Sequence, residues 1–138
     1  MIIYVDTSAA MKLIVAEKES AELADRLERH RADGDTLTAS LLLHTELNCA
    51  ANRRPEYVGR DAVSSVLSAI ALVDIESSDL IMAPLLPGHL RSADAIHLAT
   101  ALRLNARALA VYDLELVAAA RIAGIEAISP GTGSPGVG

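Results

Sequence analysis

Short apolar runs alternate along the chain with longer segments in which apolar residues recur every three or four positions. The apolar runs predict strands at residues 2–5, 36–38, 72–75, 108–111 and 125–128. The segments between them predict amphipathic helices at residues 9–14, 19–30, 41–53, 57–70, 92–104 and 114–123. Regular alternation of strands and helices predicts a parallel sheet covered on both faces, and therefore an α/β fold.

A chain of 138 residues fits a single domain. We expect residues 1–128 to form the folded domain and residues 129–138, which are rich in Gly and Pro, to form a flexible tail. Cys49 is the only cysteine, which excludes a disulfide and a cysteine-based zinc site within one chain. The chain has no Trp and no Phe, which excludes base stacking on aromatic rings as the main device for binding RNA.

The longest apolar runs are far shorter than the roughly 18 residues of a membrane span, so we expect no contact with a membrane. Residues 1–6 lack the basic and long apolar parts of a signal peptide, which favours a cytoplasmic protein. Acidic residues outnumber basic ones by 18 to 12, for a net charge of −6, whereas simple polyanion binders are usually basic. The positions of the carboxylates are therefore more informative than their number.

Two aspartates stand where predicted strands end and helices begin. Asp6 follows the run at 2–5 directly, and Asp113 follows the run at 108–111 after a single tyrosine. In open parallel sheets, ligands bind at the edge formed by the carboxyl ends of the strands. A helix N-cap explains an aspartate at either position equally well, so both interpretations stay open.

Glu46 and Asp94 lie on predicted helices among small and apolar neighbours. With helical spacing, Leu42, Glu46 and Ala50 share one stripe, where burial would raise the pKa of a carboxyl without a cationic partner. A buried salt bridge to an arginine is the structural alternative. Asp94 falls in the first turn of its helix, where the helix dipole favours a negative charge and where the side chain is also suited to point into a cleft.

Carboxylates that converge repel one another and keep protons unless a divalent cation neutralises them. Ligand sets made only of oxygen favour Mg²⁺ or Mn²⁺ over zinc. Such a site can ionise a water molecule and stabilise charge that develops on a phosphoryl oxygen. If these acidic side chains meet, they predict a site for Mg²⁺, for which Mn²⁺ substitutes.

Several segments together resemble the PIN-domain nucleases, and among them the VapC toxins of bacterial type II toxin–antitoxin pairs. The segments are Val-Asp-Thr-Ser-Ala at 5–9, Glu-Leu at 46–47, Asp-Ala-Ile-His-Leu-Ala-Thr-Ala at 94–101 and Tyr-Asp at 112–113. The segment at 94–101 is the most specific of them, and the opening segment alone is weak. The resemblance covers residues 1–128 and rests on the order, spacing and total length of the segments.

The resemblance implies a three-layer α/β/α sandwich on a short parallel sheet of about four to five strands. It also implies an acidic metal site, with Ser8 supporting it by hydrogen bonding; the acidic residues are Asp6, Glu46, Asp94 and Asp113. Asp6 and Asp94 would be metal ligands, and Glu46 would ligate the ion or help to deprotonate the attacking water. Asp113 would bind the ion or its water, although the family often has a small hydroxyl or amide residue where Tyr112 stands.

The implied reaction is in-line hydrolysis of RNA phosphodiesters, which leaves 5′-phosphate and 3′-hydroxyl ends. The implied partners are RNA, a cognate VapB-like antitoxin that blocks the acidic cleft, and a second copy of the chain in a homodimer or in a hetero-oligomer with the antitoxin. RNA contact would need a local basic rim, although an ordinary solvated charge is the simpler interpretation of each candidate. The candidates are Lys12, Arg53, Arg54, Arg60 and Arg91.

Other phosphoryl-transfer proteins also place an aspartate at a parallel strand end beside Mg²⁺. Haloacid-dehalogenase-type phosphatases need a second aspartate two residues after the first, where this chain has Ser8. Receiver domains need a lysine after a late strand, but the only lysines are Lys12 and Lys18. A catalytically silent binding module fits poorly, because no acidic position of the pattern is lost. His97, one turn after Asp94, is expected to be a packed, hydrogen-bonded histidine rather than one that orients a carboxylate or a phosphate.

Overall fold

Five short strands pair in parallel, in the order β3-β2-β1-β4-β5, in the computed structural model, which describes residues 1–133. The strands are β1 (Ile2–Val5), β2 (Thr36–Ser40), β3 (Ala71–Val73), β4 (Ala108–Ala110) and β5 (Glu126–Ile128). The chain builds β1, β2 and β3 outward in one direction and then returns to place β4 on the other side of β1. This reversal makes the carboxyl edge beside β1 and β4 the expected place for a ligand.

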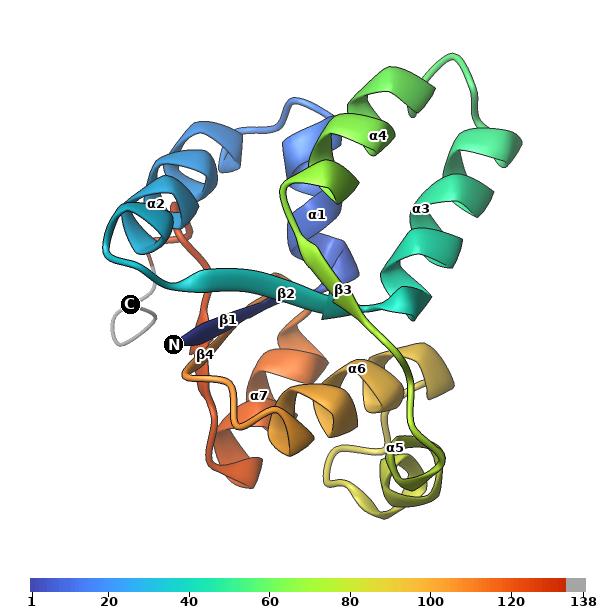
Figure 1. Ribbon diagram of the computed structural model, residues 1–138, viewed down its shortest axis with the longest axis vertical. Helices are drawn as coiled ribbons and strands as arrows, with labels where there is room; N and C mark the ends of the chain where they lie inside the picture. Colours follow the sequence, from blue (N-terminus) through green and yellow to red (C-terminus); the bar gives the residue numbers. More distant parts are fainter. Residues whose placement is uncertain (134–138) are drawn as a thin grey trace.

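Helices cover both faces of the sheet (Figure 1). One face carries α1 (Thr7–Ile14), α2 (Ser20–Ala32), α3 (Leu41–Arg53) and α4 (Arg60–Ser68). The other carries α5 (Ser77–Met82), a 3₁₀ turn η1 (Ala83–Leu85), α6 (Ser92–Arg103) and α7 (Leu114–Ala123). The predicted fold class, a three-layer α/β/α sandwich on a parallel sheet, is confirmed.

Most predicted elements are present, with shifted ends. The helix expected at 57–70 begins only at Arg60, because residues 55–58 form a turn in which the Val58 amide donates to the Arg54 carbonyl oxygen. Pro55 disfavours helical backbone at Arg54, so the chain leaves α3 there and turns back. At the other end of the chain, α7 stops at Gly124, whose φ of 93° lies in the left-handed region that glycine adopts without strain.

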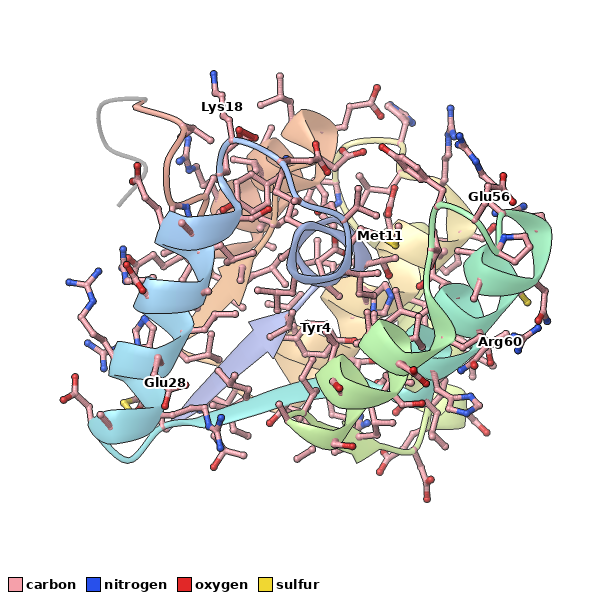
Figure 2. All side chains as sticks on the ribbon, turned by 90° about the horizontal axis from the view of Figure 1, so that it is seen from above. Tyr4, Met11, Lys18, Glu28, Glu56 and Arg60 are labelled. Atoms are coloured by element: carbon pink, nitrogen blue, oxygen red, sulfur yellow. The ribbon has the colours of Figure 1, made fainter. Side chains whose placement is uncertain are left out.

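The core between the layers is built from small side chains and aliphatic residues. Alanines of α1, α6 and α7 are buried together with Ile3, Tyr4 and Val5 of the central strand. Figure 2 shows Tyr4 in the interior, whereas Lys18, Glu28, Glu56 and Arg60 lie at the outside of the molecule. Because Tyr4 carries a hydroxyl group into this apolar interior, it needs a hydrogen-bond partner there.

The first residues of the expected tail contact the fold. Ser129 is buried and donates its hydroxyl to the Val111 carbonyl oxygen, and the Tyr112 hydroxyl donates to the Pro130 carbonyl oxygen at 2.7 Å. These hydrogen bonds hold residues 129–130 beside the strand end of β4, so this part differs from the flexible tail expected from composition. Residues 134–138 of that tail lie outside the described residues. No helix within residues 1–133 is long and apolar enough to cross a membrane.

Candidate active site

Two of the predicted acidic residues occupy the carboxyl edge of the sheet. The Asp6 amide donates to the Ala110 carbonyl oxygen at 3.0 Å, which extends the pairing of β1 with β4 by one residue. Asp6 also caps α1, and Asp113 caps α7 by accepting a hydrogen bond from the Leu116 amide at 3.0 Å. The capping interpretation is therefore correct for both residues, and it leaves oxygens of both carboxylates at the edge where ligands bind.

Asp6 is a buried carboxylate, only 1% exposed, and just one of its oxygens is paired. Oδ2 accepts hydrogen bonds from the Ser8 amide at 3.1 Å and the Ser8 hydroxyl at 2.6 Å. The Ser8 hydroxyl in turn accepts from the Tyr112 amide at 2.9 Å, so Ser8 joins the ends of β1 and β4. Oδ1 of Asp6 is buried and has no partner within residues 1–133. Such an oxygen is unfavourable unless a cation or a water molecule meets it.

Asp94 lies one turn before His97 on α6, half-buried. Burial raises the pKa of Asp94 to about 6, and repulsion by the charges of Asp6 and Asp113, with a smaller contribution from Glu46, adds to this effect. Coulombic repulsion falls with distance, so charges that raise this pKa belong to carboxylates in the neighbourhood of Asp94. A cation bound beside Asp94 would relieve the repulsion.

Glu46 lies at the margin of the buried face of α3, with its side chain 27% exposed. Burial alone would raise the pKa of Glu46, as expected from the sequence, but hydrogen bonds from His97 and Thr7 outweigh it and lower the pKa below its ordinary value. Both hydrogen bonds reach Oε1, each at 2.6 Å. The alternative of a buried salt bridge to an arginine is wrong, because a histidine and a threonine hold this carboxylate.

His97 is fully buried and hydrogen-bonded at both ring nitrogens, as predicted, but it also contacts the Glu46 carboxylate, which was not expected from the sequence. Nε2 contacts Glu46 Oε1 and, at 3.1 Å, the Thr7 hydroxyl, and Nδ1 contacts the Tyr4 hydroxyl. Thr7 and Tyr4 are the residues that sequence reasoning missed. The available signals were the Asp-Thr-Ser segment, where Thr7 adjoins a predicted ligand, and the single aromatic hydroxyl in an apolar strand, which requires a buried partner.

The short contacts at this edge hold single carboxylates: Ser8 holds Asp6, and Thr7 and His97 hold Glu46. Within residues 1–133, no three His, Cys, Asp or Glu side chains are grouped tightly enough to hold a metal ion as they stand.

The residues predicted to form a basic rim have different surroundings in the structure. Lys12 is not available to a phosphate, because it forms ion pairs with Glu19 at 2.8 Å and Glu17 at 3.3 Å. The Arg54 guanidinium stacks over the Tyr57 ring at 4.8 Å from its centroid. Other members are exposed at the surface, as solvated charges are; these are Arg53, Arg60 and Arg91.

The comparisons with known proteins agree with this arrangement. Residues 3–124 match the PIN domain family. The chain belongs to the PIN-domain family. Among curated PIN-domain relatives, Ribonuclease VapC35 of Mycobacterium tuberculosis (strain H37Rv) is 39% identical over 135 residues, which cover 94% of this chain and 97% of that protein.

Solved PIN-domain structures share the fold of this chain. A VapBC2 complex from Rickettsia felis, bound to a DNA fragment from its promoter, matches with a TM-score of 0.66 at 17% identity, over 86% of this chain and 93% of that chain. VapC20 of Mycobacterium tuberculosis, a toxin that cleaves the sarcin–ricin loop, matches with a TM-score of 0.65 at 16% identity, over 89% and 95%. The predicted family is confirmed, and the two other phosphoryl-transfer folds are not supported.

Proposed function

We propose that this protein is a divalent-metal-dependent ribonuclease, the toxin of a type II toxin–antitoxin pair. The observation that carries the proposal is Asp6, a buried carboxylate at the carboxyl edge of the sheet whose Oδ1 lacks a partner within the described chain. Relatives over nearly the whole chain are named as VapC ribonucleases, which supports RNA as the substrate.

The residues present suit Mg²⁺, with Mn²⁺ as a substitute, because all candidate ligands are carboxylate oxygens. Asp6 and Asp94 would hold the ion, and Glu46 and Asp113 would complete its surroundings directly or through water. Bound there, the ion would lower the pKa of a water molecule and stabilise charge on the phosphoryl oxygens.

Each protein group then has a definite task in the hydrolysis. Ser8 holds Asp6 through two hydrogen bonds, so that Oδ1 stays directed away from the protein donors. Glu46, with its lowered pKa, is a carboxylate at neutral pH and can accept a hydrogen bond or a proton from the attacking water. The water oxygen gives up a proton and forms a bond to phosphorus while the bond from phosphorus to the 3′ oxygen breaks. The 3′ oxygen takes up a proton from solvent, so the products are a 5′-phosphate and a 3′-hydroxyl end.

The partners follow from the same comparisons. The solved neighbours include a VapBC2 complex and a toxin–antitoxin complex from Klebsiella pneumoniae, which supports a cognate VapB-like antitoxin for this chain. A protein segment that covers Asp6 and Asp94 would exclude RNA from the carboxylates. We also propose a homodimer within such a toxin–antitoxin assembly, and the cytoplasm as the place where the toxin meets its RNA.

The test is cleavage of RNA by purified protein with Mg²⁺ or Mn²⁺, together with growth of cells that express it. Asp6→Ala and Asp94→Ala should each abolish cleavage and growth inhibition while the protein stays folded by circular dichroism. The matched control is Asp25→Ala, which removes an exposed carboxylate of α2 and should leave both unchanged. Cleavage by either site variant at the rate of the parent would refute the assignment.

A further inference from the structure

A buried chain of hydrogen bonds runs from the end of β2 to the carboxylate of Glu46. The Ser40 amide donates to the Tyr4 hydroxyl at 3.0 Å, and this hydroxyl lies 2.6 Å from Nδ1 of His97. Nε2 of His97 lies 2.6 Å from Oε1 of Glu46. Tyr4 and His97 are both fully buried, and their rings meet edge to face with centroids 5.6 Å apart. The chain therefore connects the centre of the sheet with the active-site edge.

The donor and the acceptor of each hydrogen bond in this chain can be assigned by starting from the backbone amide. The Ser40 amide can only donate, so the Tyr4 oxygen accepts there and its own proton is free for another partner. Within residues 1–133, the only other hydrogen-bond partner of the Tyr4 hydroxyl is Nδ1 of His97. If Nδ1 carried a proton, the Tyr4 proton would be buried without an acceptor. Nδ1 is therefore the acceptor, and the proton of the neutral imidazole lies on Nε2.

This tautomer directs a donor at Glu46. The Nε2 proton of His97 and the hydroxyl proton of Thr7 both reach Oε1, each at 2.6 Å between heavy atoms. Every hydrogen bond that Glu46 forms with its side chain in the described residues falls on this oxygen, and Oε2 has no protein partner there. The side chain is 27% exposed, and Oε2 is not among the buried oxygens without a partner in the described residues.

We propose that Tyr4 and His97 are positioning residues, which hold one oxygen of Glu46 so that the other is directed to the ion or the attacking water. This inference rests on the proposed function. His97 also lies one helical turn after Asp94, so α6 places a metal ligand and the residue that orients a second acidic group on one rigid element. Partners that orient acidic groups in this way typically change metal affinity or activity by about 10–100-fold when they are removed.

The first experiment compares two amides at position 97. The amide nitrogen of glutamine reaches about the position of Nε2, whereas the shorter asparagine side chain reaches only that of Nδ1. His97→Gln should therefore retain kcat within about tenfold, and His97→Asn should lower kcat by about 10–100-fold with KM nearly unchanged. Tyr4→Phe, which removes a single oxygen atom, should lower kcat by about tenfold. His89→Asn is the matched control, because His89 is exposed and has a φ of 49°, a conformation that asparagine tolerates.

The second experiment asks whether His97 acts through Glu46. The dissociation constant for Mn²⁺ is measured by electron paramagnetic resonance in the absence of RNA for Glu46→Gln, His97→Asn and the double variant. We expect His97→Asn to weaken Mn²⁺ binding in the parent and to have no further effect in the Glu46→Gln background. Additive effects, or His97→Asn and Tyr4→Phe with parental kcat and Mn²⁺ affinity, would overturn the inference. If both variants of His97 fail to fold, Tyr4→Phe decides alone, measured on kcat and on Mn²⁺ affinity.

The outcome also separates this inference from the proposed function. An Asp6→Asn variant that still cleaves RNA would refute the ribonuclease site itself. A nuclease that requires Asp6 but tolerates His97→Asn would refute only the positioning role. Equal loss of kcat in His97→Gln and His97→Asn would show that the Nε2 donor is not what matters, and would likewise refute it.

Discussion

Asp94→Asn should stabilise the metal-free protein at neutral pH while it abolishes cleavage. Burial, together with the charges of Asp6 and Asp113, raises the pKa of Asp94 to about 6, from an ordinary value of 3.8. Between these two values the folded protein binds more protons than the unfolded chain, so the free energy of unfolding falls as pH rises. Above about pH 6 the whole penalty for an ionised Asp94 is present, and asparagine carries no such charge.

The magnitude follows from the size of the pKa shift. About two pKa units correspond to about 3 kcal/mol at 1.36 kcal/mol per unit. Solvent screening of a partly exposed carboxylate reduces this to about half. Asparagine also gives up roughly 0.5 kcal/mol of favourable interaction with the amino end of α6. We therefore expect a net gain of about 1 kcal/mol at pH 7, or roughly 3–5 °C in Tm for a chain of this size.

The assay is thermal unfolding followed by circular dichroism in EDTA, at pH 4 and pH 7. Asp94→Asn should unfold at a higher temperature than the parent at pH 7, and the difference should vanish at pH 4, where folded Asp94 is protonated. Added Mn²⁺ should raise the Tm of the parent more than that of the variant. Asp25→Asn, an exposed position of α2, is the control for loss of a negative charge. A Tm at pH 7 equal to or below that of the parent would refute the penalty that burial and the neighbouring charges impose on ionised Asp94.

Two further substitutions test the hydrogen bonds of Ser8 and the ion pair between Arg103 and Asp79. Ser8→Ala removes the hydroxyl between Asp6 and the Tyr112 amide, so it should lower the free energy of unfolding, measured in urea, by about 2 kcal/mol. It should also raise the Mg²⁺ concentration needed for half-maximal cleavage. If neither value changes, the contact is contradicted. Arg103→Ala leaves Asp79, which is 2% exposed, without its ion pair at 2.8 Å, and should lower the free energy of unfolding by about 3 kcal/mol. The added substitution Asp79→Asn should recover part of this loss, and a double variant no more stable than the single one would contradict it.

The sequence was sufficient to identify acidic residues in unusual positions as candidates for the site. Asp6 follows its apolar strand directly and Asp113 comes shortly after another, and parallel strands bring their carboxyl ends to one edge, so the position of both residues at that edge could be expected. Ser8 was expected to support the site, and its hydrogen bond to Asp6 is present. The roles of these side chains in metal binding and cleavage remain predictions for the experiments above.

The surroundings of Glu46 could not be predicted in the same way. The helical stripe indicated a carboxylate beside an apolar face and hence a raised pKa, but the pKa is lowered. Its partners come from the start of α1 and the middle of α6, and no local pattern specifies that His97 meets Glu46 across 51 positions of sequence. Only the packing of helices from opposite faces at the edge of the sheet decides this contact.

By itself, the sequence determined the α/β alternation and the family, and it predicted four acidic positions for the site, because these depend on local periodicity and on motifs of short range. Only the tertiary structure decided which carboxylate oxygen of Asp6 and of Glu46 accepts hydrogen bonds from the protein. Oδ2 of Asp6 and Oε1 of Glu46 are held by protein donors, while Oδ1 of Asp6 has no partner within residues 1–133. The physical reason is that hydrogen bonds and Coulombic repulsion depend on distances of a few ångströms between side chains, which exist only once remote segments pack together.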